Sequence, residues 1–98
     1  MEAIDLKKIL DFSGIKPGDV ITRVFGGTSY WEAHVFRVET GVIYCTVSVD
    51  VPRTMLFTQS TGVNTLGIDY GFLVNVPPPQ NQADVLELRQ ILSAFLNP

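Results

Sequence analysis

The sequence predicts a mainly β fold of the α+β type, in which a five-stranded antiparallel meander lies between two helices. Three runs rich in β-branched and aromatic residues are typical of strands: residues 19–25, 30–38 and 42–49. Turn signals separate these runs at Gly26-Gly27 and at Glu39-Thr40-Gly41. Apolar residues at helical spacing near the C-terminus are the third observation.

Composition limits both the size of the fold and its partners. The 98 residues, 46% of them hydrophobic, suffice for one core, so we expect a single domain over residues 1–98. Ten acidic residues against seven basic ones give a net charge of -3, which argues against a nucleic-acid binder. The single cysteine excludes an internal disulfide. The N-terminal stretch lacks the pattern of a signal peptide, and no apolar run reaches the ~20 residues that span a membrane, so we expect a cytoplasmic protein without a membrane partner.

Residues 1–13 form the predicted N-terminal helical segment. Acidic residues come early in it and basic residues later, an order that suits the dipole of a helix. Gly14 ends this segment, and Pro17-Gly18 turns the chain into the meander, which is expected over residues 18–76.

Side-chain parity sets the predicted register of the first hairpin, because a slip of one residue exchanges the two faces of a strand. A two-residue loop at Gly26-Gly27 pairs Thr22 with Trp31. One face then holds mostly apolar residues: Val20, Thr22, Val24, Trp31, Ala33 and Val35. The opposite face, called the mixed face below, holds Ile21, Arg23, Phe25, Tyr30, Glu32, His34 and Phe36.

The second hairpin supports the same assignment. A three-residue loop, with Gly41 in the left-handed region, pairs Val35 with Cys45. On the apolar face the third strand then adds only apolar residues: Ile43, Cys45, Val47 and Val49. Arg37 is the one residue that interrupts this face. A two-residue loop would place polar residues of the third strand on it, so the longer loop is preferred.

Two further strands complete the predicted sheet, over residues 54–58 and 66–76. Gly67 and Gly71 lie inside the second of these, and glycines within strands mark bulges or sharp bends. Five short strands with such bends predict a small SH3-like barrel or a strongly bent sheet. An open sheet capped by helices is the alternative.

A proline-rich spacer, residues 77–82, separates the sheet from the predicted C-terminal helix, residues 83–97. Asn81 offers a side-chain cap to the start of that helix. One face of the helix carries an apolar stripe: Val85, Leu88, Leu92 and Phe95. The stripe suits packing on the chain's own sheet or on a partner, and in the second case these residues would form an oligomerisation surface.

No residue pattern predicts catalysis. Cys45 and His34 are the only cysteine and histidine, and the expected register places them on opposite faces, so Cys45 is interpreted as a small buried residue. These two residues are too few for a zinc site, and the acids show no calcium-loop spacing. Gly26-Gly27 lies between two strands without the lysine of a phosphate-binding loop. We therefore expect neither an enzyme, nor a metal site, nor a bound cofactor.

The mixed face is the candidate binding surface, because aromatic residues and arginine are enriched at interaction hot spots. Its candidate contact residues, with one from the third strand, are Arg23, Phe25, Tyr30, Glu32, His34, Phe36 and Tyr44. They predict a non-catalytic module that binds a protein partner or itself. A terminal helix that covers these aromatic residues is the structural alternative. The functional alternatives are a single-stranded nucleic-acid-binding barrel using Arg23 and Arg37, which the net charge disfavours, and a small-ligand site near Trp31.

Two sets of turn motifs lie within the meander: Gly18-Asp19-Val20-Ile21-Thr22-Arg23 with Gly27-Thr28, and Thr61-Gly62 with Asp69-Tyr70-Gly71-Phe72. They resemble motifs of short bacterial small-barrel proteins that are themselves uncharacterised. The resemblance covers roughly residues 18–72 and implies an SH3-like fold. It implies no activity and no functional residue.

Overall fold

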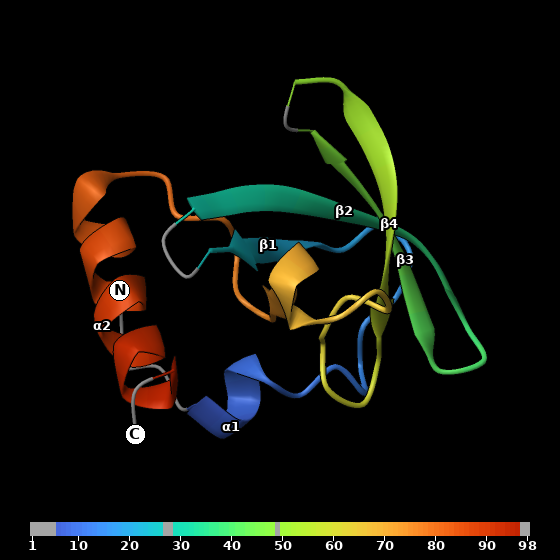
Figure 1. Ribbon diagram of the computed structural model, residues 1–98, viewed down its shortest axis with the longest axis horizontal. Coiled ribbons are helices and arrows are strands. Elements are labelled where there is room, and N and C mark those ends of the chain that lie inside the picture. The colour runs from blue at the N-terminus through green and yellow to red at the C-terminus, as the bar shows by residue number, and fades with distance from the viewer. Residues whose placement is uncertain (1–5, 27–28, 49, 97–98) are drawn as a thin grey trace.

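The computed structural model describes residues 6–26, 29–48 and 50–96, and Figure 1 shows their arrangement. This part of the chain forms α1 (Leu6–Ile9), β1 (Val20–Phe25), β2 (Ser29–Glu39), β3 (Val42–Ser48), β4 (Pro52–Thr58), the 3-10 helix η1 (Ile68–Tyr70), β5 (Phe72–Val74) and α2 (Gln82–Leu96). In Figure 1, α2 lies to the left of the sheet and α1 lies below it. None of the helices in these ranges is long and apolar enough to cross a membrane.

The five strands form one antiparallel sheet in the order β4-β3-β2-β1-β5. The sheet curls into a half-barrel flanked by the two helices, which confirms the predicted fold class. Residues 62–65 lie between the two edge strands and bond to both. The Leu73 N–H donates to the Gly62 carbonyl (2.8 Å), and the Thr58 N–H donates to the Val63 carbonyl (2.8 Å). This segment therefore joins the edges of the half-barrel over part of their length.

The register of the first hairpin differs by one residue from the prediction. Ile21 pairs with Ala33 and Arg23 pairs with Trp31, so β1 presents Ile21 and Arg23 to the inside of the curl. Val24, on the other face of β1, is also fully buried, because α2 covers that face. Both faces of β1 are buried, so the alternation of side chains along the strand could not show which face lies inside the half-barrel. The predicted two-residue loop at Gly26-Gly27 is wrong, since Phe25 pairs with Ser29.

The second hairpin contains a bulge, which the predicted register lacks. Val35 pairs with Cys45 as predicted, but the register shifts between Val35 and Arg37, and Arg37 pairs with Tyr44. The loop is therefore two residues long, Thr40-Gly41, with φ angles of 54° and 76°. The bulge inserts Phe36 as an extra residue in β2, so Arg37 lies on the outside of the curl and not on the inside. The inner face therefore stays apolar although the loop is short.

The predicted fifth strand is mostly not a strand. Of residues 66–76, only Phe72–Val74 pair in the sheet, and Ile68–Tyr70 form η1. Gly67 and Gly71 flank η1 with φ angles of 119° and 101°. These values lie in a region that glycine tolerates and that breaks a strand, so the glycines mark a change of structure and not a bend within one strand.

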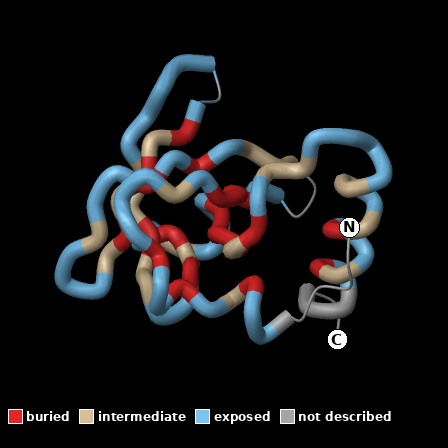
Figure 2. The backbone as a smooth tube through the Cα atoms, turned by 180° about the vertical axis from the view of Figure 1, so that it is seen from behind, coloured by how far each residue is buried: buried red, intermediate tan, exposed pale blue. Residues whose placement is uncertain are grey.

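Two apolar clusters pack on opposite faces of the sheet. The inner cluster fills the half-barrel: Phe12, Ile15, Ile21, Ala33, Val35, Ile43, Cys45, Val47, Phe57 and Leu73. The outer cluster lies between the sheet and the helices: Ile9, Val24, Phe72, Val74, Val76, Leu88 and Leu92. Figure 2 shows the buried stretches in the middle of the sheet and on the side of α2 that faces it.

The C-terminal helix packs on the chain's own sheet, which settles the position that the sequence left open. It begins at Gln82, one residue earlier than predicted. Asn81 caps it as expected, because its Oδ1 accepts a hydrogen bond from the Asp84 N–H (2.9 Å). At the other end of the chain α1 covers only Leu6–Ile9, and residues 1–5 of the predicted helical segment lie outside the described residues.

Candidate functional site

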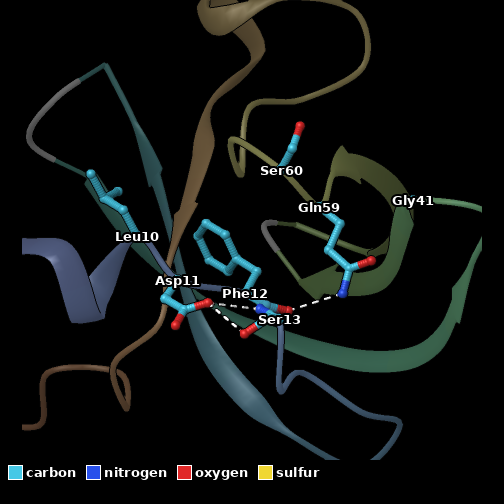
Figure 3. Close-up of a pocket in the computed structure, with 7 residues that line it drawn as sticks. All are labelled: Leu10, Asp11, Phe12, Ser13, Gly41, Gln59 and Ser60. Carbon is cyan, nitrogen blue, oxygen red and sulfur yellow. Dashed lines mark hydrogen bonds between the residues drawn. The ribbon is translucent and has the colours of Figure 1, made fainter.

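One end of the half-barrel is closed by its own side chains. A hollow of about 470 Å³ lies there, beside the β2–β3 turn, lined by Leu10, Asp11, Phe12, Ser13, Gly41, Gln59 and Ser60. Figure 3 shows the hydrogen bonds between residues of its lining. The Gln59 amide donates to the Phe12 carbonyl (3.0 Å), and the Asp11 carboxylate accepts from the Ser13 hydroxyl (2.7 Å) and N–H (3.0 Å). These bonds from Ser13 lower the pKa of Asp11.

The opposite end of the half-barrel is open, and we call it the barrel mouth. Two adjoining hollows of about 390 Å³ each form it. Both are lined by Arg23, Arg53 and Met55. The first adds Thr54, Leu56, Asn64, Thr65, Leu66 and Tyr70. The second adds Phe25, Ser29, Trp31 and Asp50. The mouth thus combines β1, β2, β4 and the segment around η1.

Arg23 is the central residue of the mouth, and it is only 5% exposed. Its Nη2 donates to the Tyr70 carbonyl (2.7 Å), and its guanidinium lies 4.8 Å from the centre of the Phe25 ring. Its buried Nε has no acceptor among the described residues. Burial lowers the pKa of this guanidinium, but arginine stays protonated in proteins. The mouth therefore holds a desolvated positive charge.

Trp31 contributes a second unpaired donor. It is the direct cross-strand partner of Arg23, so the two side chains share the inner face of the sheet. The Trp31 Nε1 is buried and, like the Arg23 Nε, finds no acceptor in the described part of the chain. Each buried donor without an acceptor costs about 1–3 kcal/mol. The inner face of the sheet therefore carries two buried N–H donors, on paired residues, to which no described residue supplies an acceptor.

The remaining lining residues favour a ligand that is anionic at one point and apolar around it. Arg53 is a second base, and Asp50 is the one acid among the described residues that line the two hollows. Large apolar side chains are exposed at the rim: Phe25, Leu66 and Tyr70, of which Leu66 is 74% exposed. Exposed apolar groups beside a groove are typical of an interaction surface.

The predicted contact residues do not form one surface. Arg23 and Phe25 line the mouth, whereas Tyr30 packs against the outer cluster beneath α2. Glu32 and His34 are exposed on the outer face, where the His34 Nε2 lies 3.1 Å from the Glu32 Oε2. Phe36 and Tyr44 contact each other near the β2–β3 turn, with ring centroids 6.2 Å apart. The single mixed face is therefore wrong, because the shifted register turns Arg23 and Phe25 to the inside of the curl, whereas the other five predicted residues lie on its outside.

Sequence reasoning missed most of the residues that complete the mouth. Arg53, Met55, Asn64 and Tyr70 come from β4 and from the chain around η1, far from Arg23 in the sequence. The sequence places Trp31 only near the alternative small-ligand site. A three-residue loop between the first two strands would have placed Trp31 opposite Arg23. The length of this loop was therefore the feature of the sequence that could have predicted the pair.

The apolar stripe of the C-terminal helix serves the fold of this chain. Leu88 and Leu92 are each 1% exposed and belong to the outer cluster, and Val85 is half-buried. The side chain of Phe95 lies outside the described residues. Self-association through Leu88 and Leu92 would require α2 to leave the sheet, and it stays a prediction.

Cys45 and His34 lie on opposite faces of the sheet, as expected. Cys45 is fully buried in the inner cluster, and burial raises the pKa of its thiol to about 12. His34 is exposed on the outer face. Within the described ranges no three histidine, cysteine or acidic residues gather as a metal site would need.

Comparisons of the chain with protein-family models, with curated proteins and with solved structures find no match. The resemblance to small bacterial barrel proteins thus rests on the turn motifs alone.

Proposed function

We propose that the chain is a non-catalytic protein-interaction module whose barrel mouth binds a carboxylate-bearing segment of a partner protein. One observation carries the proposal: Arg23 and Trp31 each place a buried N–H, without an acceptor in the described chain, on the same side of neighbouring strands. The proposal keeps the cytoplasmic setting predicted from the sequence.

A carboxylate suits these two donors better than a neutral group. Hydrogen bonds from a charged donor to a charged acceptor are shorter and about twice as strong as neutral ones. Such a ligand would offset the desolvated charge of Arg23 and give the Trp31 indole an acceptor. The charge of Arg23 is offset only when the ligand binds, because within the described residues no carboxylate bonds to Arg23.

The side chains around Arg23 favour binding over chemistry. Tryptophan, tyrosine and arginine dominate interaction hot spots, and Trp31, Tyr70 and Arg53 line the mouth together. Catalysis by a nucleophile needs a base within hydrogen-bond reach. Cys45 and His34, the residues suited to such a pair, lie away from the mouth and on opposite faces.

Nuclear magnetic resonance can test the proposal on the full chain. Trp31 is the only tryptophan, so its indole N–H signal needs no further assignment. A capped peptide of about eight residues, with alternating threonine and valine and one central glutamate, should move the Trp31 indole and Arg23 Nε–H signals in a saturable way. The same peptide with glutamine should move them much less.

Matched variants separate the mouth from the rest of the surface. Arg23→Gln should abolish the response to the glutamate peptide, whereas Arg37→Gln should preserve it, because Arg37 lies on the outer face and pairs with Glu39. Equal responses in the two variants would overturn the proposal. A saturable shift with single-stranded oligothymidine and none with the peptide would favour the nucleic-acid alternative.

A further inference from the structure

The edge strand β4 is covered by the chain over only half of its length. Near its C-terminal end it bonds to the segment of residues 62–65, through Thr58 N–H to Val63 O (2.8 Å) and Thr65 N–H to Leu56 O (3.0 Å). Beyond Thr65 the chain turns away toward η1. From Pro52 to Met55 no described segment pairs with the outer edge of β4.

The direction of the backbone groups on this open half follows from the ladder. In an antiparallel pair, successive residues direct their N–H and C=O groups alternately toward one neighbour and the other. Leu56 and Thr58 direct theirs away from β3, as their bonds to residues 62–65 show. Thr54 must do the same, so its N–H and C=O face outward, and no described backbone group meets them.

The first hollow of the mouth runs along this open edge. Thr54, Met55 and Leu56 form one wall, Thr65 and Leu66 lie on the other, and Arg23 lines the same hollow. Met55 packs on the inner cluster, and Arg53, two residues earlier, shares its side of the strand. An extended chain laid in this hollow would therefore meet free backbone groups and the arginines together.

We infer that the segment bound in the mouth is an extended, acidic strand of a partner protein that adds to the free edge of β4 at Thr54. This inference rests on the proposed function and adds its geometry. Main-chain bonds to the outward N–H and C=O of Thr54 supply affinity, and one carboxylate side chain reaches Arg23 and Trp31 to supply specificity. Charge complementarity supports this occupant, because Arg23 and Arg53 flank the edge.

The position of Pro52 and Arg53 limits indiscriminate pairing at this edge. Proline lacks an N–H, and charged side chains on edge strands discourage aggregation through backbone pairing. An acidic strand would find its charge matched at Arg53, whereas a basic strand would be repelled. The open edge is in this way selective for the charge of its occupant.

Hydrogen exchange on the full chain tests the inference with the glutamate peptide described above. Exchange of the Thr54 amide proton should slow by about tenfold when the peptide saturates the mouth. The same peptide with N-methyl groups on consecutive central residues can donate a ladder bond from neither edge there, and it should bind about tenfold more weakly. Acetate alone should bind far more weakly than the peptide.

A pair of substitutions provides an independent readout. Thr54→Pro removes the outward N–H without removing a bond to β3, and it should weaken peptide binding about tenfold. Thr54→Val keeps the N–H and should bind within about twofold of the unmodified chain. If Thr54→Pro does not fold, the N-methylated peptide still decides the question on the unmodified protein.

The outcomes distinguish the two proposals. If the Trp31 indole moves while Thr54 exchange does not, and the N-methylated peptide binds equally well, strand addition is overturned and the carboxylate site stands. If the glutamate peptide moves neither signal, both fall. If the Thr54 amide is already protected without peptide and light scattering shows a dimer, a second copy of the chain holds the edge, and the inference of a partner strand is overturned.

Discussion

The Arg23 guanidinium lies directly against the backbone of Gly71. A Cβ atom at position 71 would be 2.9 Å from the Arg23 Nε and 2.8 Å from the Val24 carbonyl oxygen. Gly71 also has a φ of +101° and follows Tyr70, whose carbonyl accepts the Arg23 hydrogen bond. The turn that ends η1 is therefore shaped around the arginine, and the site and the fold share this glycine.

Gly71→Ala should destabilise the protein more than Gly67→Ala. Both glycines have a strongly positive φ, +101° and +119°, but nothing lies within 4 Å of a Cβ at Gly67. The backbone strain that alanine suffers at a positive φ is thus common to the two variants. The additional loss of stability in Gly71→Ala, about 1–3 kcal/mol, comes from the contact of the new Cβ with Arg23 and Val24. Urea unfolding measures the difference. Equal losses would contradict a steric cost at Gly71 from both Arg23 and the Val24 carbonyl.

Arg23→Met should stabilise the fold while it removes ligand binding. Arg23 is buried without a carboxylate partner in the described chain, and methionine fills a similar volume without a desolvated charge. We expect the free energy of unfolding to rise by about 1 kcal/mol. Arg37→Met, at an exposed position, should change it by less than about 0.5 kcal/mol. A loss of stability in Arg23→Met would mean that its bond to Tyr70 outweighs the desolvation.

Gly62→Ala should open the closed end of the half-barrel. A Cβ there would lie 2.6 Å from two ring atoms of Phe12, whereas Gly41, with the same φ of +76°, has nothing within 4 Å. The excess loss of stability over Gly41→Ala should be about 1–3 kcal/mol. Phe12→Leu in the Gly62→Ala background should recover part of that excess, and a strictly additive double variant would contradict the steric explanation.

The sequence predicts the fold class because its signals are local. Each of these signals depends on residues that are close together in the sequence. This holds for every strand-rich run, for the turn at Thr40-Gly41 and for the cap that Asn81 gives to α2. The register of β1 is different in kind, because both of its faces are buried and only the position of α2 explains why. Parity carries no information for such a strand.

The candidate site was predictable only in part for the same reason. Arg23 and Phe25 were recognised from their residue types, but their neighbours in the mouth depend on how the half-barrel curls. Arg53 and Tyr70 lie about thirty and fifty residues away in the chain, where no pattern links them to Arg23. The bulge at Phe36 is likewise a tertiary feature, and it places Arg37 on the outer face beside Tyr44.

Cys45 should make the stability of the fold depend on alkaline pH. Burial raises the pKa of its thiol from 9.0 to about 12. Below pH 9.0 both states keep the proton and stability is unaffected. Above it the unfolded chain loses the proton first, so stability falls by about 1.4 kcal/mol per pH unit until the folded thiol ionises. Urea unfolding across this range should show the slope, and Cys45→Ala should lack this contribution. Rapid labelling of the native thiol at pH 8 would contradict its burial.

Leu88→Ala should test whether α2 belongs to the core of the single chain. Leu88 is 1% exposed between the helix and the sheet, whereas Leu86, two residues earlier on the same helix, is 46% exposed. Truncating the buried leucine should cost about 2–5 kcal/mol, and Leu86→Ala should change stability by less than about 0.5 kcal/mol. Because the predicted oligomerisation stripe includes Leu88, light scattering on the same samples bears on assembly too. If Leu88→Ala dissociates an oligomer and leaves stability intact, the helix packs on a partner in solution. If it lowers stability at an unchanged mass, the stripe serves the monomer, and partner binding depends on the barrel mouth that α2 leaves open.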